Sequence, residues 1–403
     1  MFIFGGSATY GVEAAGFHVD QILEMTDDMH LKNAYHFTQN RPDVNITPPS
    51  DWENTRYLQN LRTANLDLLY SNCPCSSLSR INRNASLNGE HNRQFYRVFN
   101  VIEQVQPKAF FIENAPALVK LGYPIIMNMV KQLGSRYRFT VIRDFAGNHN
   151  VAMKRLRTLL VGYRRDVIDG LPILEPRRQA PITIQQLLGD LWDVPLGTGV
   201  LNGVPLYNHE LVGERLWQPY EKWLNDVEVD DTLLRTILNH WETVPSELQT
   251  FVPYGNMFIR ANDKIQQGQD IWDKSPYRPR GDDYAPSITS LTHLIHPVHP
   301  RQWTIREYAR LMGYPDDFQF YPDGAATPTL TCIAQGVPAR FVEYIATEVR
   351  AVLNNQRPLL KIREPLCFQH HTQGFYRPYT LDELYQEVEL EYHSGDPYCY
   401  PFN

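Results

Sequence analysis

The segment QFYRVFNVIEQVQPKAFFIENAP, residues 94–116, decides the fold class of this chain. Apolar side chains recur along residues 94–106 with the period of an amphipathic helix. Pro107 then opens an apolar run over residues 109–112, which has the length of a buried strand and ends at Glu113. The segment therefore predicts a helix followed by a strand, which is the repeating unit of α/β proteins.

The same alternation continues on both sides of this segment. Candidate strands are short apolar runs, and they cover residues 1–4, 17–23, 66–70, 139–142 and 158–163. A turn at Gly5 and Gly6 separates the first run from a helix of small residues that ends near Ala15. Strands that alternate with helices predict a mostly parallel sheet with helices on both faces, and such sheets bind ligands at the carboxyl ends of their strands.

The pattern changes after the last of these runs. From about residue 166 to residue 283 the periodicity is poor and prolines, tryptophans and tyrosines are scattered, which indicates an inserted, irregular domain. Order returns near residue 288, with helices predicted over residues 304–312 and 339–353. We therefore predict a first domain over residues 1–165, an insertion over 166–283, a return to the first domain over 284–354 and an extension over 355–403.

The composition excludes several classes of protein. The chain has 403 residues, of which 43% are apolar, and a net charge of −7 at pH 7 with histidine neutral. No apolar run reaches the roughly 18 residues of a membrane span, so we expect no membrane association. The five cysteines lack the spacing of a disulfide framework, which favours an intracellular setting in the cytoplasm or nucleoid. The acidic balance argues only mildly against nucleic acid, because net charge does not describe one face.

A cysteine-containing turn follows the strand predicted over residues 66–70. In the sequence DLLYSNCPCSS, residues 67–77, Pro74 stiffens the approach to Cys75. A thiol in such a turn, near a helix N-terminus or a basic group, ionises more readily to a nucleophilic thiolate. A buried, inert cysteine is an equal alternative on this segment alone. A Cys-x-Cys metal site is disfavoured because no second Cys/His pair stands at ligand spacing, so we expect no bound metal.

Charged residues stand at the ends of two other predicted strands. Glu113 ends a buried strand, where burial favours the protonated form of a carboxyl and so a proton donor. Arg155 and Arg157 precede the strand predicted over residues 158–163 and lie on one side of it if the segment is extended. They could contact a base carbonyl and phosphates. The alternatives are a capping or salt-bridging role for Glu113 and an ordinary basic strand edge for the arginines.

Taken in this order, the segments resemble the conserved blocks of the DNA (cytosine-5) methyltransferases. The family's Pro-Cys nucleophile block, Glu-Asn-Val block and Gln-x-Arg-x-Arg block are matched by Pro74-Cys75, Glu113-Asn114 and Arg155-x-Arg157. The longest match, RQWTIREYARLMGYPD at residues 301–316, resembles the block that organises the target-recognition domain. The resemblance covers residues 2–163 and 284–350.

The resemblance implies a Rossmann-like S-adenosylmethionine-dependent methyltransferase sheet with helices on both faces, plus an inserted irregular target-recognition domain. Glu24 falls where the family has the acid that binds the cofactor ribose, and Asn45-Ile46 where an Asp-Ile pair meets the adenine. Phe4 replaces one glycine of the family's cofactor loop, so that its side chain would crowd the methionine end of the cofactor. The implied cofactor-binding residues are Phe4, Gly5, Gly6, Glu24, Met25, Asn45, Ile46, Pro74 and Gln335.

The resemblance also implies a mechanism in which Arg155 completes the catalytic set. The Cys75 thiolate would add to carbon 6 of cytosine, protonated Glu113 would bond ring nitrogen 3, and Arg157 would hold the carbonyl oxygen at position 2. Carbon 5 would then accept the methyl group of S-adenosylmethionine, and the base must leave the stacked duplex to be reached. The implied partners are double-stranded DNA and, if the protein belongs to a restriction-modification pair, a cognate restriction endonuclease.

Two alternatives stay open at this point. A DNA-binding relative that has lost catalysis would explain the altered glycine loop, although the joint retention of Cys75, Glu113 and Arg157 argues against it. An RNA-directed enzyme, or one with a different donor group, would keep the same catalytic residues. The large insertion favours duplex DNA, because reading a groove needs an added surface.

Overall fold

A computed structural model of the protein describes residues 1–24, 36–74, 77–78, 86–119, 121–172, 174, 182–194, 200–201, 204–206, 279–289, 294, 296–298, 303–320, 326–361 and 366–370. Two predicted site residues, Met25 and Cys75, lie outside this described part. The chain divides into two compact units. The first, here called the sheet unit, holds Met1–Asn150, Arg155–Ala180 and Gly336–Asn403, and the second, the insert unit, holds Val151–Lys154 and Pro181–Gln335.

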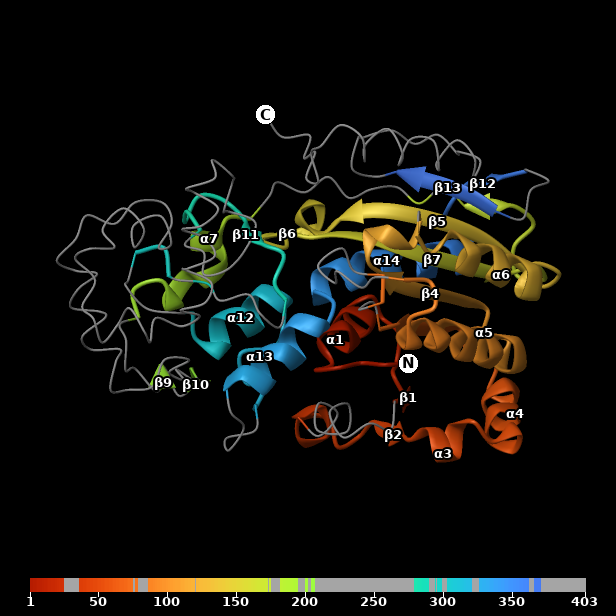
Figure 1. The fold of residues 1–403 in the computed structure, drawn as a ribbon, viewed down its shortest axis with the longest axis horizontal. Helices are drawn as coiled ribbons and strands as arrows, with labels where there is room; N and C mark the ends of the chain where they lie inside the picture. Colours follow the sequence, from red (N-terminus) through yellow and green to blue (C-terminus); the bar gives the residue numbers. More distant parts are fainter. Residues whose placement is uncertain are drawn as a thin grey trace. The chain divides into compact units, whose positions relative to one another are not determined.

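The sheet unit is built on a five-stranded mixed sheet with the order β13-β5-β7-β4-β3. Strands β13, β5, β7 and β4 are labelled in Figure 1. Its strands are β3 (Leu68–Asn72), β4 (Ala109–Asn114), β5 (Tyr137–Phe145), β7 (Leu156–Arg164) and β13 (Leu366–His370). Strand β3 is parallel to β4 and β13 is parallel to β5, whereas β7 is antiparallel to both of its neighbours, β4 and β5. All residues of β4 are buried, as its nearly continuous apolar sequence predicts.

The first residues of the chain connect this sheet to a second pair of strands, β1 (Gln21–Leu23) and β2 (Asn45–Thr47), which are parallel. Backbone hydrogen bonds join residues 1–2 to Leu23 on one side, at 3.0 Å, and to Asn72 on the other, at 3.1 Å. The strand predicted over residues 1–4 is nevertheless wrong. Phe2 and Phe4 have positive φ angles of 59° and 50°, which turn the backbone out of the extended conformation.

Helices lie on both faces of the five-stranded sheet. On one face, α5 (Arg93–Val105) and α6 (Tyr123–Leu133) share a hydrophobic cluster with Phe110 and Ile112 of β4. Because side chains alternate along a strand, Glu113 points to the opposite face. Helix α14 (Ala339–Leu353) lies on that side. Burial raises the pKa of Tyr163 in β7 well above its usual value, and the nearby charge of Glu348 in α14 raises it further. The predicted covering of both faces is confirmed.

Helix α1 (Ser7–Ala14) packs so closely on α14 that the contact requires a glycine. A Cβ atom on Gly11 would lie 2.2 Å from Ala339 O and 2.9 Å from Glu343 N, both of which are backbone atoms. We expect Gly11→Ala to lower the free energy of unfolding by about 1–3 kcal/mol, the usual cost of overpacking. Urea unfolding would measure this, with Ala14→Ser at an exposed position of the same helix as control. A loss below about 0.5 kcal/mol would show that the two helices separate easily.

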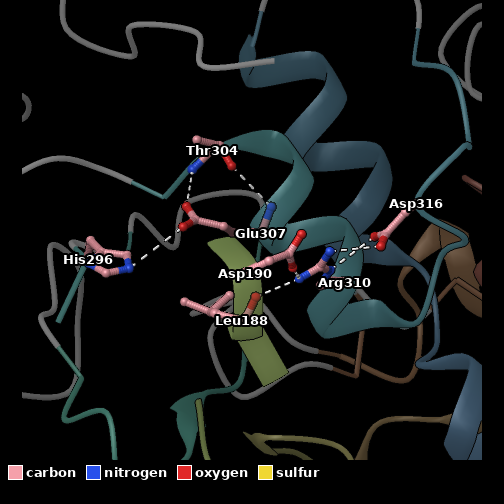
Figure 2. Close-up of polar contacts among 7 residues, drawn as sticks. All are labelled: Leu188, Asp190, His296, Thr304, Glu307, Arg310 and Asp316. Carbon is pink, nitrogen blue, oxygen red and sulfur yellow. Dashed lines mark hydrogen bonds and ion pairs between the residues drawn. The ribbon is translucent and has the colours of Figure 1, made fainter. Parts of the chain in front are cut away.

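The described part of the insert unit consists of short elements. They are β6 (Met153–Lys154), which is parallel to β11 (Ala285–Pro286), the antiparallel pair β9 (Val200–Leu201) and β10 (Val204–Pro205), and helices α7 (Ile184–Leu188), α12 (Ile305–Met312) and α13 (Ala326–Gln335). The helix predicted over residues 304–312 is confirmed as α12, because Thr304 and Glu307 form a capping box at its start. Figure 2 shows that Arg310 joins α12 to Leu188 O, Asp190 and Asp316.

The described residues that follow α14 return to the sheet. Arg357 donates to both carboxylate oxygens of Glu348, at 2.7 and 2.8 Å. Strand β12 (Leu359–Leu360) then pairs with β8 (Leu171–Pro172), and β13 adds a strand beyond β5. Since β5 is paired on both sides, it is not an open edge of the sheet.

The other elements are short. They are helices α3 (Pro49–Trp52) and α4 (Thr55–Thr63) and the 3-10 turns η1 (Glu90–Asn92), η2 (Pro116–Leu118), η3 (Ala146–His149) and η4 (Gly189–Leu191). Over the ranges given above, no helix combines the length and the apolar character needed to cross a membrane.

Candidate active site

The end of β4 fixes the turn that leads to Cys75. Glu113 and Asn114 close the strand and are 3% and 0% exposed. The Asn114 side chain donates from Nδ2 to the backbone carbonyl of Cys73 at 2.9 Å. This bond ties the turn after β3 to the carboxyl end of β4, and Cys73 and Pro74 are buried there. The described part of this turn, Cys73 and Pro74, thus lies at the end of the sheet where Glu113 stands, and Cys75 is outside the described residues.

Glu113 forms a buried ion pair with Arg157. Glu113 Oε1 lies 2.7 Å from Arg157 Nε, and the two side chains are 4% and 14% exposed. The contact between these two atoms is an ion pair, and its geometry is not that of a hydrogen bond. Strand register explains the contact: Glu113 is opposite Leu159, so Arg157, two residues earlier, shares its face of the sheet. Because water screens buried charges poorly, this pair is electrostatically stronger than a surface pair.

Arg155 belongs to the same neighbourhood but has a different partner. It stands between β6 and β7, is 3% exposed, and donates from Nη2 to Gly336 O at 2.8 Å. Its own carbonyl accepts from the amide of Ala146 at 2.8 Å. Arg155 is thereby anchored to the loop before α14, whereas Arg157 forms an ion pair with Glu113.

Tyr70 is a residue that the sequence reasoning missed. Burial raises the pKa of its phenol well above the usual value, the charge of Glu113 raises it further, and that of Arg155 opposes the shift. The hydroxyl is buried and has no hydrogen-bond partner among the residues that the structure describes. The available signal was a tyrosine directly after the apolar residues Leu68 and Leu69 of β3.

A glycine turn and a buried acid meet at the start of the chain. Glu24 follows β1, is 0% exposed, and accepts from the amide of Ile3 through Oε2 at 2.8 Å. Gly6 has a φ angle of 88°, and a Cβ atom there would lie 2.2 Å from the Phe37 ring. The turn leads directly into α1, whose first amides point toward it. A tight turn at a helix N-terminus beside an acid after the next strand is suited to a nucleoside-containing cofactor.

Phe4 shows how this turn accommodates the departure from the family's glycine. Its φ angle of 50° lies in the left-handed region that glycine adopts without strain. The side chain is 5% exposed, so it is packed within the sheet unit. Gly5 beside it is also buried. The backbone therefore keeps the conformation that a glycine would give, at a steric cost on the order of 1 kcal/mol.

The structure does not bring every predicted cofactor residue to this turn. Asn45 lies in β2, where it is opposite Gln21 and is exposed. Ile46, the next residue, packs against the hydrophobic cluster that contains Ile3 and Phe37, beside the turn. Because Glu24 follows the other end of the parallel pair, Asn45 and Glu24 stand at opposite ends of these strands. Gln335 is the last residue of α13 in the insert unit.

Comparisons with known proteins agree with this arrangement. A family model described as C-5 cytosine-specific DNA methylase matches residues 1–351. The Type II methyltransferase M.MthTI of Methanothermobacter thermautotrophicus is 23% identical over 281 residues, which cover 69% of this chain and 76% of that protein. The Type II methyltransferase M.NgoMIV of Neisseria gonorrhoeae is 21% identical over 359 residues, which cover 87% and 96% of the two chains.

A solved structure shares the fold. It is a prophage-encoded protein of E. coli described as a DNA modification methyltransferase, with a TM-score of 0.60 and 18% identity over 88% of this chain and 98% of that chain. The sheet, the turn before α1 and this likeness define the fold of the S-adenosylmethionine-dependent methyltransferases, as the sequence predicts.

The chain belongs to the C-5 cytosine-specific DNA methylase family, because that family's model matches 1–351 of its 403 residues. It is therefore a DNA (cytosine-5) methyltransferase, and its methyl donor is S-adenosylmethionine. The family, the enzyme class and the cofactor inferred from the sequence are confirmed.

Proposed function

We propose that this enzyme methylates carbon 5 of cytosine in duplex DNA through a covalent intermediate between Cys75 and a base that is flipped out of the duplex. The observation that carries the proposal is the buried ion pair of Glu113 and Arg157, at the end of the sheet where Asn114 also bonds the carbonyl of Cys73. An acid and a guanidinium side by side complement the edge of cytosine that carries ring nitrogen 3 and the carbonyl oxygen at position 2.

The pair would open to receive this edge of the base. Arg157 would donate to the carbonyl oxygen, and Glu113, once it holds a proton, would donate to ring nitrogen 3. The negative charge that builds on the ring during nucleophilic attack would then meet groups already in place. Arg155 would support Arg157 through the backbone, since its side chain is fixed on Gly336 O.

Cys75 would carry out the covalent step. Its thiolate adds to carbon 6, which forms a sulfur–carbon bond, breaks the aromaticity of the ring and places electron density on carbon 5. S-adenosylmethionine supplies an electrophilic methyl group when it is bound. Loss of the proton from carbon 5 and expulsion of the Cys75 thiolate restore the aromatic ring. Carbons 5 and 6 are not accessible inside the stacked duplex, so the base must be extruded.

Glu24, Phe4, Gly5 and Gly6 would hold the cofactor, with Met25, Pro74 and Gln335 as further contacts. The carboxylate of Glu24 would accept hydrogen bonds from the ribose hydroxyls. Asn45 and Ile46 would contact the adenine of the cofactor. Asn45 stands at the end of β2 that is far from Glu24, so it would reach the cofactor from the other end of the strand.

We expect Glu24→Gln to weaken binding of S-adenosylmethionine about tenfold to a hundredfold, since a hydrogen bond to a charged acceptor contributes about 1.5–3 kcal/mol. Calorimetric titration would measure the Kd, with Glu53→Gln on the surface as a matched control. An unchanged Kd for Glu24→Gln in a folded protein would remove Glu24 from the cofactor site.

The insertion over residues 166–283 would form the target-recognition domain, and residues 1–165 and 284–354 the catalytic domain. An added domain of this size offers a surface that reads base edges in the major groove while phosphate contacts set its register. Both relatives named above are called Type II methyltransferases, so a cognate restriction endonuclease is the protein partner that we propose.

Transfer of a labelled methyl group from S-adenosylmethionine to matched nucleic acids tests this function. We expect incorporation into duplex DNA as 5-methylcytosine, and none into RNA of the same sequence. Incorporation into RNA alone, or methylation of a different atom of the base, would contradict the proposal.

A further inference from the structure

A second buried acid lies next to Arg157 and plays no part in the mechanism above. Asp144 of β5 is 0% exposed. Its Oδ2 lies 2.9 Å from Nε2 of His149, and its Oδ1 accepts from the amide of Phe145 at 2.7 Å. The side chains of this histidine–aspartate pair are 1% and 0% exposed, so the pair belongs to the interior of the sheet unit.

Strand register places Asp144 beside Arg157, whose guanidinium we propose to bind the base. Asp144 is directly opposite Arg157 in the antiparallel pair β5–β7. Residues opposite each other point to the same face, with Cβ atoms about 4.5–5.5 Å apart. Glu113 points to that face from β4, on the other side of β7. Arg157 therefore stands on the central strand with one buried acid on each neighbouring strand.

Two buried carboxylates can compete for one guanidinium. A buried carboxylate is strongly destabilised unless a donor or a cation satisfies it. The Phe145 amide and, at 3.3 Å, the Asn148 side chain donate to Oδ1 of Asp144, and His149 is bonded to Oδ2. Arg157 forms its ion pair with Glu113. The donor that His149 supplies thus weighs against an Asp144–Arg157 pair.

The histidine ring is itself held in place by α14. It stacks on Tyr344 with ring centroids 4.1 Å apart and planes inclined by 21°, and the Phe341 ring is 5.3 Å away. Its second nitrogen, Nδ1, has no hydrogen-bond partner among the described residues. A phenylalanine at this position would therefore keep the ring contacts and lose one hydrogen bond, the bond to Asp144.

We propose that His149 is a positioning residue for methyl transfer, which bonds Asp144 and so leaves Arg157 to Glu113 and the base. The inference rests on the proposed role of Arg157 in binding the base. His149 lies outside the segments that resemble the family's conserved blocks. In a variant that lacks the histidine donor, we expect the negative charge of Asp144 to be the cause of the lost activity.

The test measures single-turnover methyl transfer to duplex DNA for four variants. We expect His149→Phe to slow the reaction at least about tenfold, because small displacements of a positioning group cost one to two orders of magnitude. We expect His149→Gln, whose amide can donate to Asp144, to retain most of the rate. Asp144→Asn alone should react within about threefold of the wild type, and the double variant His149→Phe/Asp144→Asn should recover most of the loss.

A purely structural role predicts different results. If the role is structural, His149→Phe should lower the thermal unfolding midpoint and the rate of methyl transfer together. Asp144→Asn should then worsen the His149→Phe variant instead of rescuing it. The Kd for S-adenosylmethionine should stay within about twofold in all four variants, which separates kcat from cofactor binding. His18→Ala, which removes the histidine of an exposed His–Asp contact of 3.0 Å, is the matched control and should leave the rate unchanged.

The outcomes distinguish this inference from the proposed function. Wild-type protein that methylates no DNA would defeat the function itself. Wild-type protein that is active, with His149→Phe at the same rate or with no rescue by Asp144→Asn, would overturn only the role of His149. If His149→Phe does not fold, His149→Gln and Asp144→Asn remain as tests, and we expect both to be active. Loss of methyl transfer in either folded variant would overturn the role of His149.

Discussion

Replacement of Cys75 by alanine is expected to abolish methyl transfer, with a loss of at least about a thousandfold. Without a nucleophile at carbon 6, carbon 5 stays part of an aromatic ring and does not attack the methyl donor, and loss of a covalent nucleophile typically costs several orders of magnitude. Cofactor affinity should stay within about threefold, because the proposed cofactor contacts come from other residues. Incorporation of labelled methyl groups into duplex DNA measures the first quantity, and calorimetric titration the second.

The neighbouring cysteine provides a matched control. Cys73→Ala removes a thiol two residues away and keeps the backbone carbonyl, which is the group that Asn114 contacts. We expect this variant to remain active within about tenfold. Activity in Cys75→Ala together with its loss in Cys73→Ala would mean that the nucleophile is assigned to the wrong sulfur.

Glu113→Gln is expected to lower methyl transfer by about a hundredfold to a thousandfold. The amide can still donate a hydrogen bond to ring nitrogen 3, but it cannot transfer a proton as charge develops there, and a preorganised group of this kind contributes about 3–4 kcal/mol. The substitution also leaves the guanidinium of Arg157, 14% exposed, without its acid. We therefore expect the free energy of unfolding to fall by about 1–3 kcal/mol, less than for a fully buried pair.

A double-mutant cycle separates these two effects. Arg157→Gln alone should slow transfer by a similar factor, and Glu113→Gln/Arg157→Gln should be little slower than the worse single variant, because both residues act on one edge of the base. In urea unfolding, the double variant should recover part of the stability lost in Glu113→Gln. Additive losses of rate would show that the two residues act independently, against the proposed shared site.

The sequence predicts helices and buried strands of this fold well where one strong local pattern dominates. The helix predicted over residues 94–106 forms as α5 (Arg93–Val105), and that predicted over 339–353 forms as α14 (Ala339–Leu353). Their apolar periodicity is long, and Pro107 follows the first of them directly. Strand β4 is equally clear, because its first four residues are all apolar, as expected of a strand buried on both faces.

Prediction fails where tertiary contacts override the local pattern. Residues 1–4 are apolar and read as a strand, but Phe2 and Phe4 adopt left-handed conformations that only the surrounding structure can impose. Strand β13 pairs with β5, and Leu366 is opposite Phe139. More than 200 residues separate these two strands in the sequence. No local signal identifies such a partner.

The candidate site divides in the same way. Glu113, Arg155 and Arg157 can be picked out from the sequence because each stands at a strand end within a recognisable block. Their partners cannot: the contact of Arg157 with Glu113, the anchoring of Arg155 on Gly336 O and the position of Asp144 opposite Arg157 all depend on strand order. Tyr70 and His149 were missed because their significance comes only from what lies next to them.

The covalent step can be observed directly with duplex DNA that contains 5-fluorocytosine. Fluorine replaces the hydrogen on carbon 5, so carbon 5 cannot lose a proton and the Cys75 thiolate is not expelled. After incubation with S-adenosylmethionine, mass spectrometry of the digested complex should find the nucleotide on the peptide that contains Cys75, and no such species in Cys75→Ala. Normal methylation of ordinary DNA without any adduct, or an adduct on another residue, would contradict the account.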